Sequence, residues 1–333
     1  MRHVSKAELI AALYEHPGLI PLRIHHKTLE WIDLERYHIY EGFFHKAVDR
    51  FTALKQSVGN GTSVFRLLSD LTILADRDIL VQSSEPTGFI FHCGRSGSTL
   101  LTKVLARDRG HLVIGEAAAH NQLLLALTDN GRTALQATNE QRTIYRNLLL
   151  LMGRKRLPNY NRYFVKFTSF NILFFDFIRR AFPGVPAIFL YREPAQILAS
   201  FERSPPSWFD RNDDALQRML TMKAKALSGS LALEEFLGDF FQAGLTITDG
   251  VSLLDYQDLR SQNLPEILKA LKVESTAAQV AIMQTQFQYD AKEENRSQPF
   301  SLNRALPNAL PPNHRLAKLY QQLRQSPLNI IKP

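Results

Sequence analysis

The spacing of apolar residues divides the chain into two regions. Up to about residue 86, apolar and aromatic residues recur at mixed helical spacings, which predicts a mainly helical region. From residue 88 onward, short apolar runs typical of buried strands alternate with longer stretches of helical period. We expect strands at residues 89–92, 112–115, 163–167, 187–191 and 251–254, and helices at 98–106, 141–152, 170–182, 194–202 and 216–241.

This alternation indicates the fold class and the domain organisation. Strands that alternate with helices typically form a parallel sheet covered by helices, with ligands bound at the carboxyl ends of the strands. Turn residues between Ser83 and Gly88 precede the first strong strand and mark a boundary. We therefore predict a mainly helical N-terminal region over 1–86, a candidate for contact with the substrate, and an α/β domain over 87–333.

Two local features refine the N-terminal region. Ser5 and Glu8 have the spacing of a capping box, which predicts a helix through Leu13. The region is also rich in aromatic residues, which fit either a packed core or a substrate wall, with the core as the commoner outcome. They are Trp31, Tyr37, Tyr40, Phe43, Phe44 and Phe51.

The junction between the first strong strand and its helix has the composition of an anion site. Its small residues let the backbone approach a ligand closely, and the N–H groups that open the next helix favour negative charge. Arg95 adds a permanent cation whose planar donors suit tetrahedral oxyanions. We therefore predict that a phosphate or sulfate group binds at Gly94, Arg95, Ser96, Gly97, Ser98 and Thr99.

A second junction lies after the strand at 187–191. Arg192 follows this strand directly, and Ser200 lies eight residues later on the predicted helix. That spacing carries the serine about two turns along the helix, and an arginine can form charge-assisted bonds to a phosphate. The alternative is a surface ion pair for Arg192 and an ordinary helical serine.

The two motifs together resemble the sulfotransferases that use 3′-phosphoadenosine 5′-phosphosulfate (PAPS). A Walker A loop would continue with Lys and Ser or Thr after its second glycine, whereas Ser98 and Thr99 follow Gly97 here. The Arg-Ser-Gly-Ser-Thr-Leu run is similar to a variant of the family's 5′-phosphosulfate loop. The resemblance covers about residues 88–300 and implies a P-loop-like sheet, with Arg192 and Ser200 at the 3′-phosphate.

The resemblance also implies further site residues. Lys292 and Arg296 lie in a polar late segment that would close over the 3′-phosphate, although the family's Arg-Lys-Gly loop is poorly matched there. Residues 254–259 resemble a late strand-end motif with a tyrosine. Lys166 lies in a segment that matches the family and would contact the transferred sulfonyl oxygens, or else simply extend from a strand end.

Sulfuryl transfer needs a general base, cations that offset developing charge, and in-line positioning. Glu116, at the end of the second predicted strand, is the first candidate for the base, because relatives with this loop often use a glutamate there. His120 is the alternative, since an imidazole titrates near neutrality. Arg95 and Lys166 would supply the cations. We expect no metal, because Arg192 stands at the strand end where a nucleotide hydrolase could place a magnesium-binding aspartate, and the histidines form no tight cluster in the sequence.

Composition limits the remaining possibilities. The 333 residues carry a net charge of +8, which favours anionic ligands, but no compact basic tract with interleaved aromatics indicates nucleic acid. Cys93 is the single cysteine, so no intrachain disulfide can form, and a reducing cytoplasm is the expected compartment. No apolar run approaches the ~20 residues of a membrane span.

The sequence thus predicts an enzyme that transfers sulfuryl from PAPS to a hydroxyl, or secondarily an amine, of a small molecule or glycan. Two other classes stay open: a non-catalytic nucleotide or sulfated-ligand binding protein, and a P-loop kinase. The kinase interpretation is weakened by the missing Gly-Lys-Ser/Thr ending and by the lack of a clear magnesium ligand. Acceptor identity and oligomeric state do not follow from the sequence.

Overall fold

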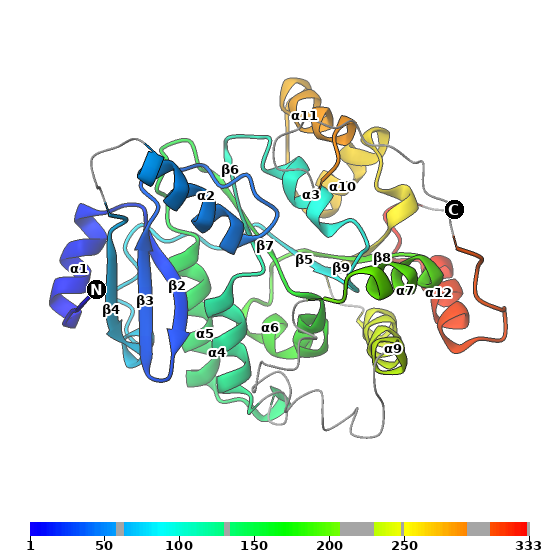
Figure 1. Cartoon of the computed structure of the whole chain (residues 1–333), viewed down its shortest axis with the longest axis horizontal. Helices are drawn as coiled ribbons and strands as arrows, with labels where there is room; N and C mark the ends of the chain where they lie inside the picture. Colours follow the sequence, from blue (N-terminus) through cyan, green and yellow to red (C-terminus); the bar gives the residue numbers. More distant parts are fainter. Residues whose placement is uncertain (58–62, 130–133, 207–229, 248–249, 292–306, 332–333) are drawn as a thin grey trace.

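The computed structural model of the chain describes residues 1–57, 63–129, 134–206, 230–247, 250–291 and 307–331. Its centre is a parallel five-stranded sheet in the order β6-β7-β5-β8-β9 (Figure 1). The strands are β5 (Gly88–His92), β6 (His111–Gly115), β7 (Arg162–Lys166), β8 (Ala187–Tyr191) and β9 (Val251–Asp255). All five strands expected from the apolar runs are therefore confirmed, within a residue at either end.

Helices cover both faces of this sheet. Successive side chains of a strand point to opposite faces, so Phe89 and Phe91 pack in one hydrophobic cluster and Ile90 in another. The first cluster contains residues of α4 (Ala118–Leu127), α5 (Asn139–Met152), α6 (Phe175–Ala181), α7 (Pro194–Arg203), α9 (Ser230–Thr246) and α12 (Arg315–Gln325). The second contains residues of α3 (Ser98–Leu105), α10 (Leu264–Ala270) and α11 (Ala277–Gln284). The predicted fold class, a parallel sheet flanked by helices, is confirmed.

The helices expected at 98–106, 141–152 and 194–202 correspond to α3, α5 and α7, and the other two differ in part. The segment expected at 170–182 begins as a 3-10 turn, Ser169–Phe174, and continues as α6. The helix expected at 216–241 falls partly outside the described residues, and α9 accounts for its C-terminal part. None of the helices that the structure describes is long and apolar enough to cross a bilayer.

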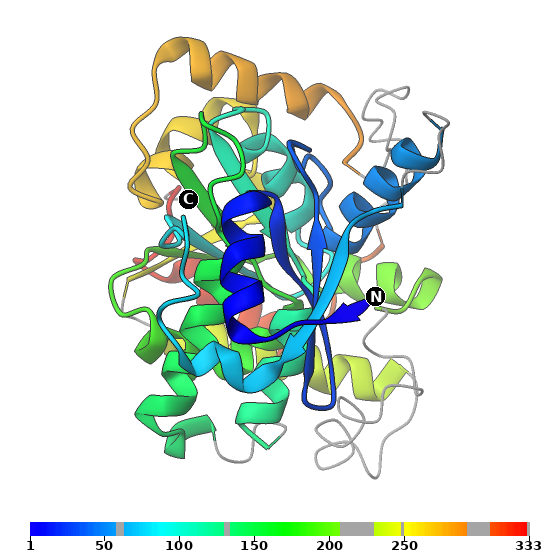
Figure 2. The same cartoon turned by 90° about the vertical axis from the view of Figure 1, so that its left-hand side faces the viewer.

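The N-terminal region is not mainly helical, and that prediction is wrong. Besides α1 (Lys6–Glu15) and α2 (Phe44–Ser57), it forms a four-stranded sheet in the order β1-β4-β3-β2 (Figure 2). The strands are β1 (Arg2–His3), β2 (Leu19–His25), β3 (Thr28–Asp33) and β4 (Arg66–Asp70). β2 and β3 pair antiparallel from Leu19↔Asp33 to His25↔Thr28, leaving a two-residue turn in which His26 has φ +53°. Pairing between strands, including the pairing of β3 and β1 with the distant β4, thus overrode the mixed local spacing.

The capping box predicted at Ser5 and Glu8 is confirmed at the start of α1. The residues of the aromatic stretch differ in their surroundings. Trp31, Phe44 and Phe51 are buried core residues, whereas Tyr40 and Phe43 line a pocket described below.

The N-terminal sheet packs directly on the α/β part of the chain. β2 contacts α4 and α5, and the Gln122 side-chain oxygen on α4 accepts a hydrogen bond from the Ile24 N–H at 2.7 Å. Buried Arg154, just after α5, donates to the Leu13 carbonyl at 2.5 Å. One hydrophobic cluster runs through both parts. The boundary at residue 86 therefore stays a prediction.

Candidate functional site

The loop between β5 and α3 has the backbone geometry expected of an anion cradle. Gly94, Arg95 and Gly97 adopt positive φ angles of 82°, 51° and 86°. This conformation is strained for a residue with a Cβ, so the glycines fit it and Arg95 occupies it at some cost. Gly97 precedes α3 and has no side chain with which to cap the helix. The first N–H groups of α3 are therefore suited to an external anion.

Contacts from neighbouring strands hold this loop. The Ser96 hydroxyl donates to the Leu190 carbonyl at 3.1 Å, and the Gly94 N–H donates to His92 Nδ1 at 3.0 Å. Buried Cys93 packs between them, and burial raises the pKa of its thiol to about 12, which keeps it protonated. Cys93 therefore serves as an apolar filler at neutral pH.

The structure brings the two sequence motifs together. The Arg192 guanidinium, at the end of β8, donates to the Arg95 carbonyl at 3.1 Å and to Gln196 Oε1 at 2.9 and 2.7 Å. A guanidinium has five N–H groups, so two remain beyond these three bonds to described residues. Ser200 lies one turn beyond Gln196 on α7 and is half-buried.

Arg95 itself extends toward the end of α7. Its guanidinium donates to the Ser204 carbonyl at 2.5 Å and to the Ser204 hydroxyl at 3.2 Å. This contact ties the loop to Ser204, the residue that follows α7. The loop therefore carries one arginine, Arg95, and contacts a second, Arg192.

Tyr256 lies between Arg192 and Gly97 of the anion loop. Its ring lies 4.1 Å from the Arg192 guanidinium, and a Cβ added to Gly97 would come within 2.7 Å of the same ring. Tyr256 follows β9 and belongs to the segment at 254–259 that the sequence resemblance singled out. A planar cation on an aromatic face is a favourable pairing, so Tyr256 orients Arg192 against the loop.

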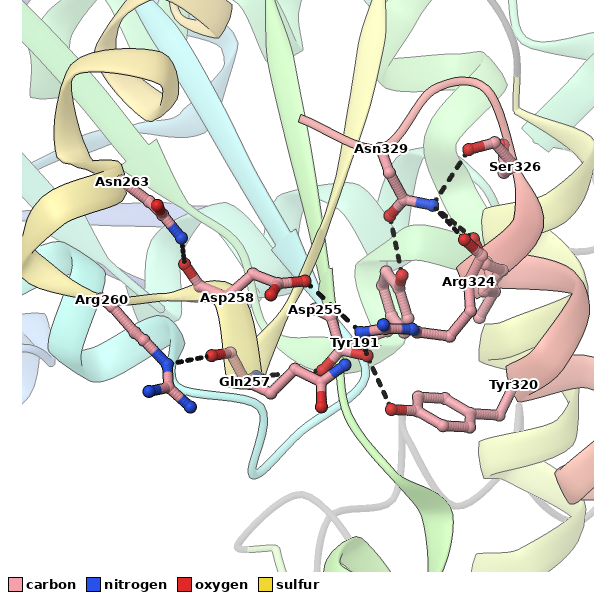
Figure 3. Close-up of polar contacts among 11 residues, drawn as sticks. Tyr191, Asp255, Gln257, Asp258, Arg260, Asn263, Tyr320, Arg324, Ser326 and Asn329 are labelled. Carbon is pink, nitrogen blue, oxygen red and sulfur yellow. Dashed lines mark hydrogen bonds and ion pairs between the residues drawn. The ribbon is translucent and has the colours of Figure 1, made fainter. Parts of the chain in front are cut away.

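A polar cluster around Asp255, the residue before Tyr256, holds the end of β9 (Figure 3). The Asp255 carboxylate, 2% exposed, accepts hydrogen bonds from the Tyr320 hydroxyl at 2.7 Å, Arg324 at 3.2 Å and the Gln257 N–H at 3.0 Å. Burial raises the pKa of Asp255, and these donors oppose that rise. Helix α12 is thereby tied to the residue that precedes Tyr256.

The same cluster anchors the C-terminal segment. The Tyr191 hydroxyl donates to Asn329 Oδ1 at 2.7 Å, while the Asn329 amide donates to the last carbonyls of α12 (Figure 3). Residues 328–330 lie parallel to β9 through bonds with Leu253. The sequence offered no signal for this cluster, because α12 is far from β9 in the chain.

On the other side of the loop, Glu116 lies at the end of β6 in an ion pair with Lys166. Lys166 Nζ is 2.7 Å from Glu116 Oε1, and the Glu116 N–H donates to the Lys166 carbonyl at 2.8 Å. Glu116 has φ +51°, which turns the chain sharply after the strand. Lys166 is fully buried; it also donates to the Gly42 carbonyl at 2.9 Å and lies 4.0 Å from the Phe43 ring.

His92 is a site residue that the sequence analysis missed. It ends β5, and its Nε2 lies 3.5 Å from Glu116 Oε1. Because Nδ1 accepts the Gly94 N–H, the neutral ring carries its hydrogen on Nε2, facing the carboxylate. A polar residue closing a buried strand just before the loop was the available signal.

These neighbours keep Glu116 ionised. Burial alone raises the pKa of the carboxyl, but the Lys166 ammonium and the facing His92 outweigh it and lower the pKa to about 2. Burial lowers the pKa of Lys166, and Glu116 opposes that change. Glu116 is therefore a carboxylate at neutral pH but a weak base while the ion pair persists.

His120 lies elsewhere, inside the first hydrophobic cluster on α4. Its Nε2 is 2.6 Å from the Tyr145 hydroxyl, its Nδ1 is 3.1 Å from Asn121 Oδ1, and its ring packs on Phe167. It is 2% exposed, and burial lowers its pKa to about 3. This environment is that of a core histidine and weighs against direct contact with an acceptor.

Two predicted site residues, Lys292 and Arg296, lie outside the described residues. Within the described part of the chain, no three His, Cys, Asp or Glu side chains gather at a spacing that could hold a metal ion.

Comparison with known proteins finds a family match for the central segment. Residues 86–228 match the model of the sulfotransferase family. Among solved structures, the chain is similar to the sulfotransferase domain of the Synechococcus PCC 7002 olefin synthase, with 15% identity and a TM-score of 0.38, over 74% of this chain and 96% of that chain. No curated protein matches the chain. The family match confirms the resemblance that the two motifs carried and supports sulfuryl transfer as the general activity.

Proposed function

Because residues 86–228 match the sulfotransferase family, we propose that this protein transfers a sulfuryl group from PAPS to a hydroxyl, or secondarily an amine, of its acceptor. The observation that carries the proposal is the bond from Arg192 to the Arg95 carbonyl, at 3.1 Å. It brings a strand-end arginine and a glycine-rich cradle to one place, as a donor with two separate anionic groups requires. PAPS would supply the sulfuryl group on a phosphate leaving group.

The cradle suits the 5′-phosphosulfate. Loop residues Gly94 to Thr99 would bind it through backbone N–H groups at the start of α3, where the helix dipole favours an anion. Arg95 would shift part of its hydrogen bonding from Ser204 to the ligand. Its permanent charge would offset the negative charge that develops on the leaving phosphate oxygen.

The 3′-phosphate would bind at Arg192 and Ser200. Two N–H groups of Arg192 remain for an anion after its bonds to Gln196 and Arg95. Tyr256 holds the guanidinium plane against the loop. Lys292 and Arg296, outside the described residues, remain proposed partners of the same phosphate.

Glu116 is the proposed base. In the transfer, a bond forms between the acceptor oxygen and sulfur, the bond from sulfur to the phosphate oxygen breaks, and the acceptor proton moves to a Glu116 carboxylate oxygen. The products are a sulfate ester and adenosine 3′,5′-bisphosphate. Because the ion pair with Lys166 lowers the pKa of Glu116, we propose that Lys166 turns from the carboxylate toward the sulfonyl oxygens, which would both strengthen the base and stabilise the charge on the sulfonyl group.

His120 stays the alternative base, although its buried position on α4 supports Glu116 over it. Both assignments proceed without a metal, because arginines and Lys166 would carry the charge compensation.

A ligand-stabilisation experiment tests the donor assignment. PAPS and adenosine 3′,5′-bisphosphate should raise the Tm without magnesium, whereas ATP should raise it weakly, because a ligand that binds the native state stabilises it. A larger, magnesium-dependent shift with ATP would reject the proposal in favour of a kinase. Tight PAPS binding with no transfer to any hydroxyl or amine compound would instead favour the binding-protein alternative.

A further inference from the structure

A pocket of about 310 Å³ adjoins the anion loop on the side of the N-terminal region. Residues of three segments form most of its wall: the turn before α2, the first turns of α2, and the start of α3. Its lining is Tyr40, Glu41, Gly42, Phe43, Lys46, Arg50, Arg95, Thr99, Lys103, Ser204 and Ala291.

The wall of this pocket carries an excess of positive charge. Four of the lining side chains are cationic and one is a carboxylate. That carboxylate, Glu41, is 7% exposed and accepts hydrogen bonds from the Tyr37 hydroxyl at 2.6 Å and the Tyr40 N–H at 3.1 Å, with Arg50 3.7 Å away. Cations in a concave wall attract anionic ligands and raise their local concentration.

Two residues of the pocket wall contact Lys166, the ion-pair partner of the proposed base Glu116. Gly42 and Phe43, which form part of its wall, are the residues that Lys166 contacts while it pairs with Glu116. Thr99 of the anion loop lies against Gly42, whereas Gly97 of the same loop lies against Tyr256. The pocket therefore adjoins the loop at Arg95 and Thr99, whereas the Arg192 site adjoins it at Gly97 through Tyr256, so an acceptor in the pocket and the 3′-phosphate of a bound donor would occupy separate places.

We propose that this pocket binds the acceptor and that the acceptor is an anionic hydroxyl compound, one that carries a carboxylate, sulfate or phosphate group besides its hydroxyl. Arg50 and Lys46 bind that anionic group, and the rings of Tyr40 and Phe43 flank the body of the molecule. This inference rests on the proposed function, because the loop must present a sulfuryl group to the pocket.

Three matched phenols test the charge preference: 4-hydroxyphenylacetate, 4-ethylphenol and tyramine carry anionic, neutral and cationic substituents on the same ring. Binding of each to the protein saturated with adenosine 3′,5′-bisphosphate is measured by calorimetry, and transfer from PAPS by mass spectrometry. We expect the carboxylate compound to bind at least about tenfold more tightly than 4-ethylphenol, and tyramine most weakly. Equal or weaker binding of the carboxylate compound overturns the proposal, whether or not any phenol is sulfated.

A pair of variants on α2 localises the effect. Arg50→Gln removes a cation from the pocket wall, whereas Lys55→Gln removes one from the same helix outside the pocket, where Lys55 pairs with Glu35. Arg50→Gln should weaken 4-hydroxyphenylacetate binding about tenfold and leave 4-ethylphenol unchanged; Lys55→Gln should change neither. Equal losses for both variants would mean that the pocket is not the binding site.

The Tm measurement separates a failure of the proposed PAPS donor from a failure of the proposed anionic acceptor. If adenosine 3′,5′-bisphosphate does not raise the Tm, the donor assignment itself fails. If it does raise the Tm and the neutral phenol binds best, the donor assignment stands and the anionic acceptor is rejected.

Discussion

The two sides of the anion loop are built by different parts of the chain. On the proposed donor side, Arg192, Tyr256 and the cluster around Asp255 all come from the α/β part, and α12 contributes Tyr320 and Arg324 to that cluster. On the proposed acceptor side, Glu116 and Lys166 depend on Gly42 and Phe43, which the N-terminal region supplies. The proposed donor side is thus formed by the parallel sheet and its own helices, whereas the proposed acceptor side also needs the turn before α2.

This difference has a functional consequence. A shared donor needs a constant site, which a rigid sheet edge provides, whereas acceptor choice can change with the segment that covers the strand ends. We therefore expect changes on one side of the loop to alter donor binding, and changes on the other side to alter turnover and acceptor preference.

The largest expected effect is on the acceptor side. Glu116→Gln keeps the shape of the side chain but removes the base, so turnover should fall by about 10²–10⁴-fold while the affinity for adenosine 3′,5′-bisphosphate changes little. Steady-state kinetics and calorimetry measure the two quantities. Near-normal turnover would pass the role of base to His120.

The next effect is on the donor side. Arg192→Ala should weaken adenosine 3′,5′-bisphosphate binding about 10–100-fold, because a charge-assisted hydrogen bond is worth about 1.5–3 kcal/mol. Ser200→Ala should cost less. Adenosine 5′-phosphosulfate lacks the 3′-phosphate and should lose little affinity in either variant. Similar losses for both ligands would assign Arg192 to folding or to the phosphosulfate.

The ion pair between Glu116 and Lys166 should make the stability of the fold depend on pH. The folded pKa of Glu116, about 2, lies below its ordinary value of 4.5, so its ionisation stabilises the fold above pH 4.5 and this stabilisation disappears as pH falls toward 2. Glu116→Gln should therefore have a lower Tm than the wild type at pH 6. The difference in Tm between the variant and the wild type should become smaller as pH falls below 4.5. A gap that stays constant across this range would contradict the ion pair with Lys166.

The smallest expected effect concerns the support behind the donor side. Arg324→Ala leaves Asp255 with fewer donors and should loosen Tyr256 and, through it, Arg192, weakening adenosine 3′,5′-bisphosphate binding by about threefold. Turnover at saturating PAPS should not change, and Arg324→Lys should restore part of the affinity. Arg315→Ala is the matched control, because Arg315 lies on the same helix and pairs with Glu235. An equal loss in the control would indicate a general effect on α12.

Much of the α/β part could be predicted from the sequence because its signals are local. A buried parallel strand is a short apolar run, as at residues 187–191, and the loop from Gly94 to Thr99 contains the glycines that its positive φ angles require. Arg192 follows its strand directly, so the common sheet edge brings it to the loop.

The N-terminal sheet and the partners of the site residues were decided by tertiary structure. Residues 19–33 form strands because β2 and β3 pair as a hairpin, β3 also pairs with the distant β4, and β2 packs on α4; the last two contributions lie outside any local window. Glu116, Lys166, His92 and Gly42 come from four separate segments, and the charge state of Glu116 depends on that meeting. The sequence by itself determined which polar groups stand at the strand ends. The tertiary structure decided which of them form ion pairs and how far their pKa values shift, because Coulomb and desolvation energies depend on distance and burial rather than on order in the chain.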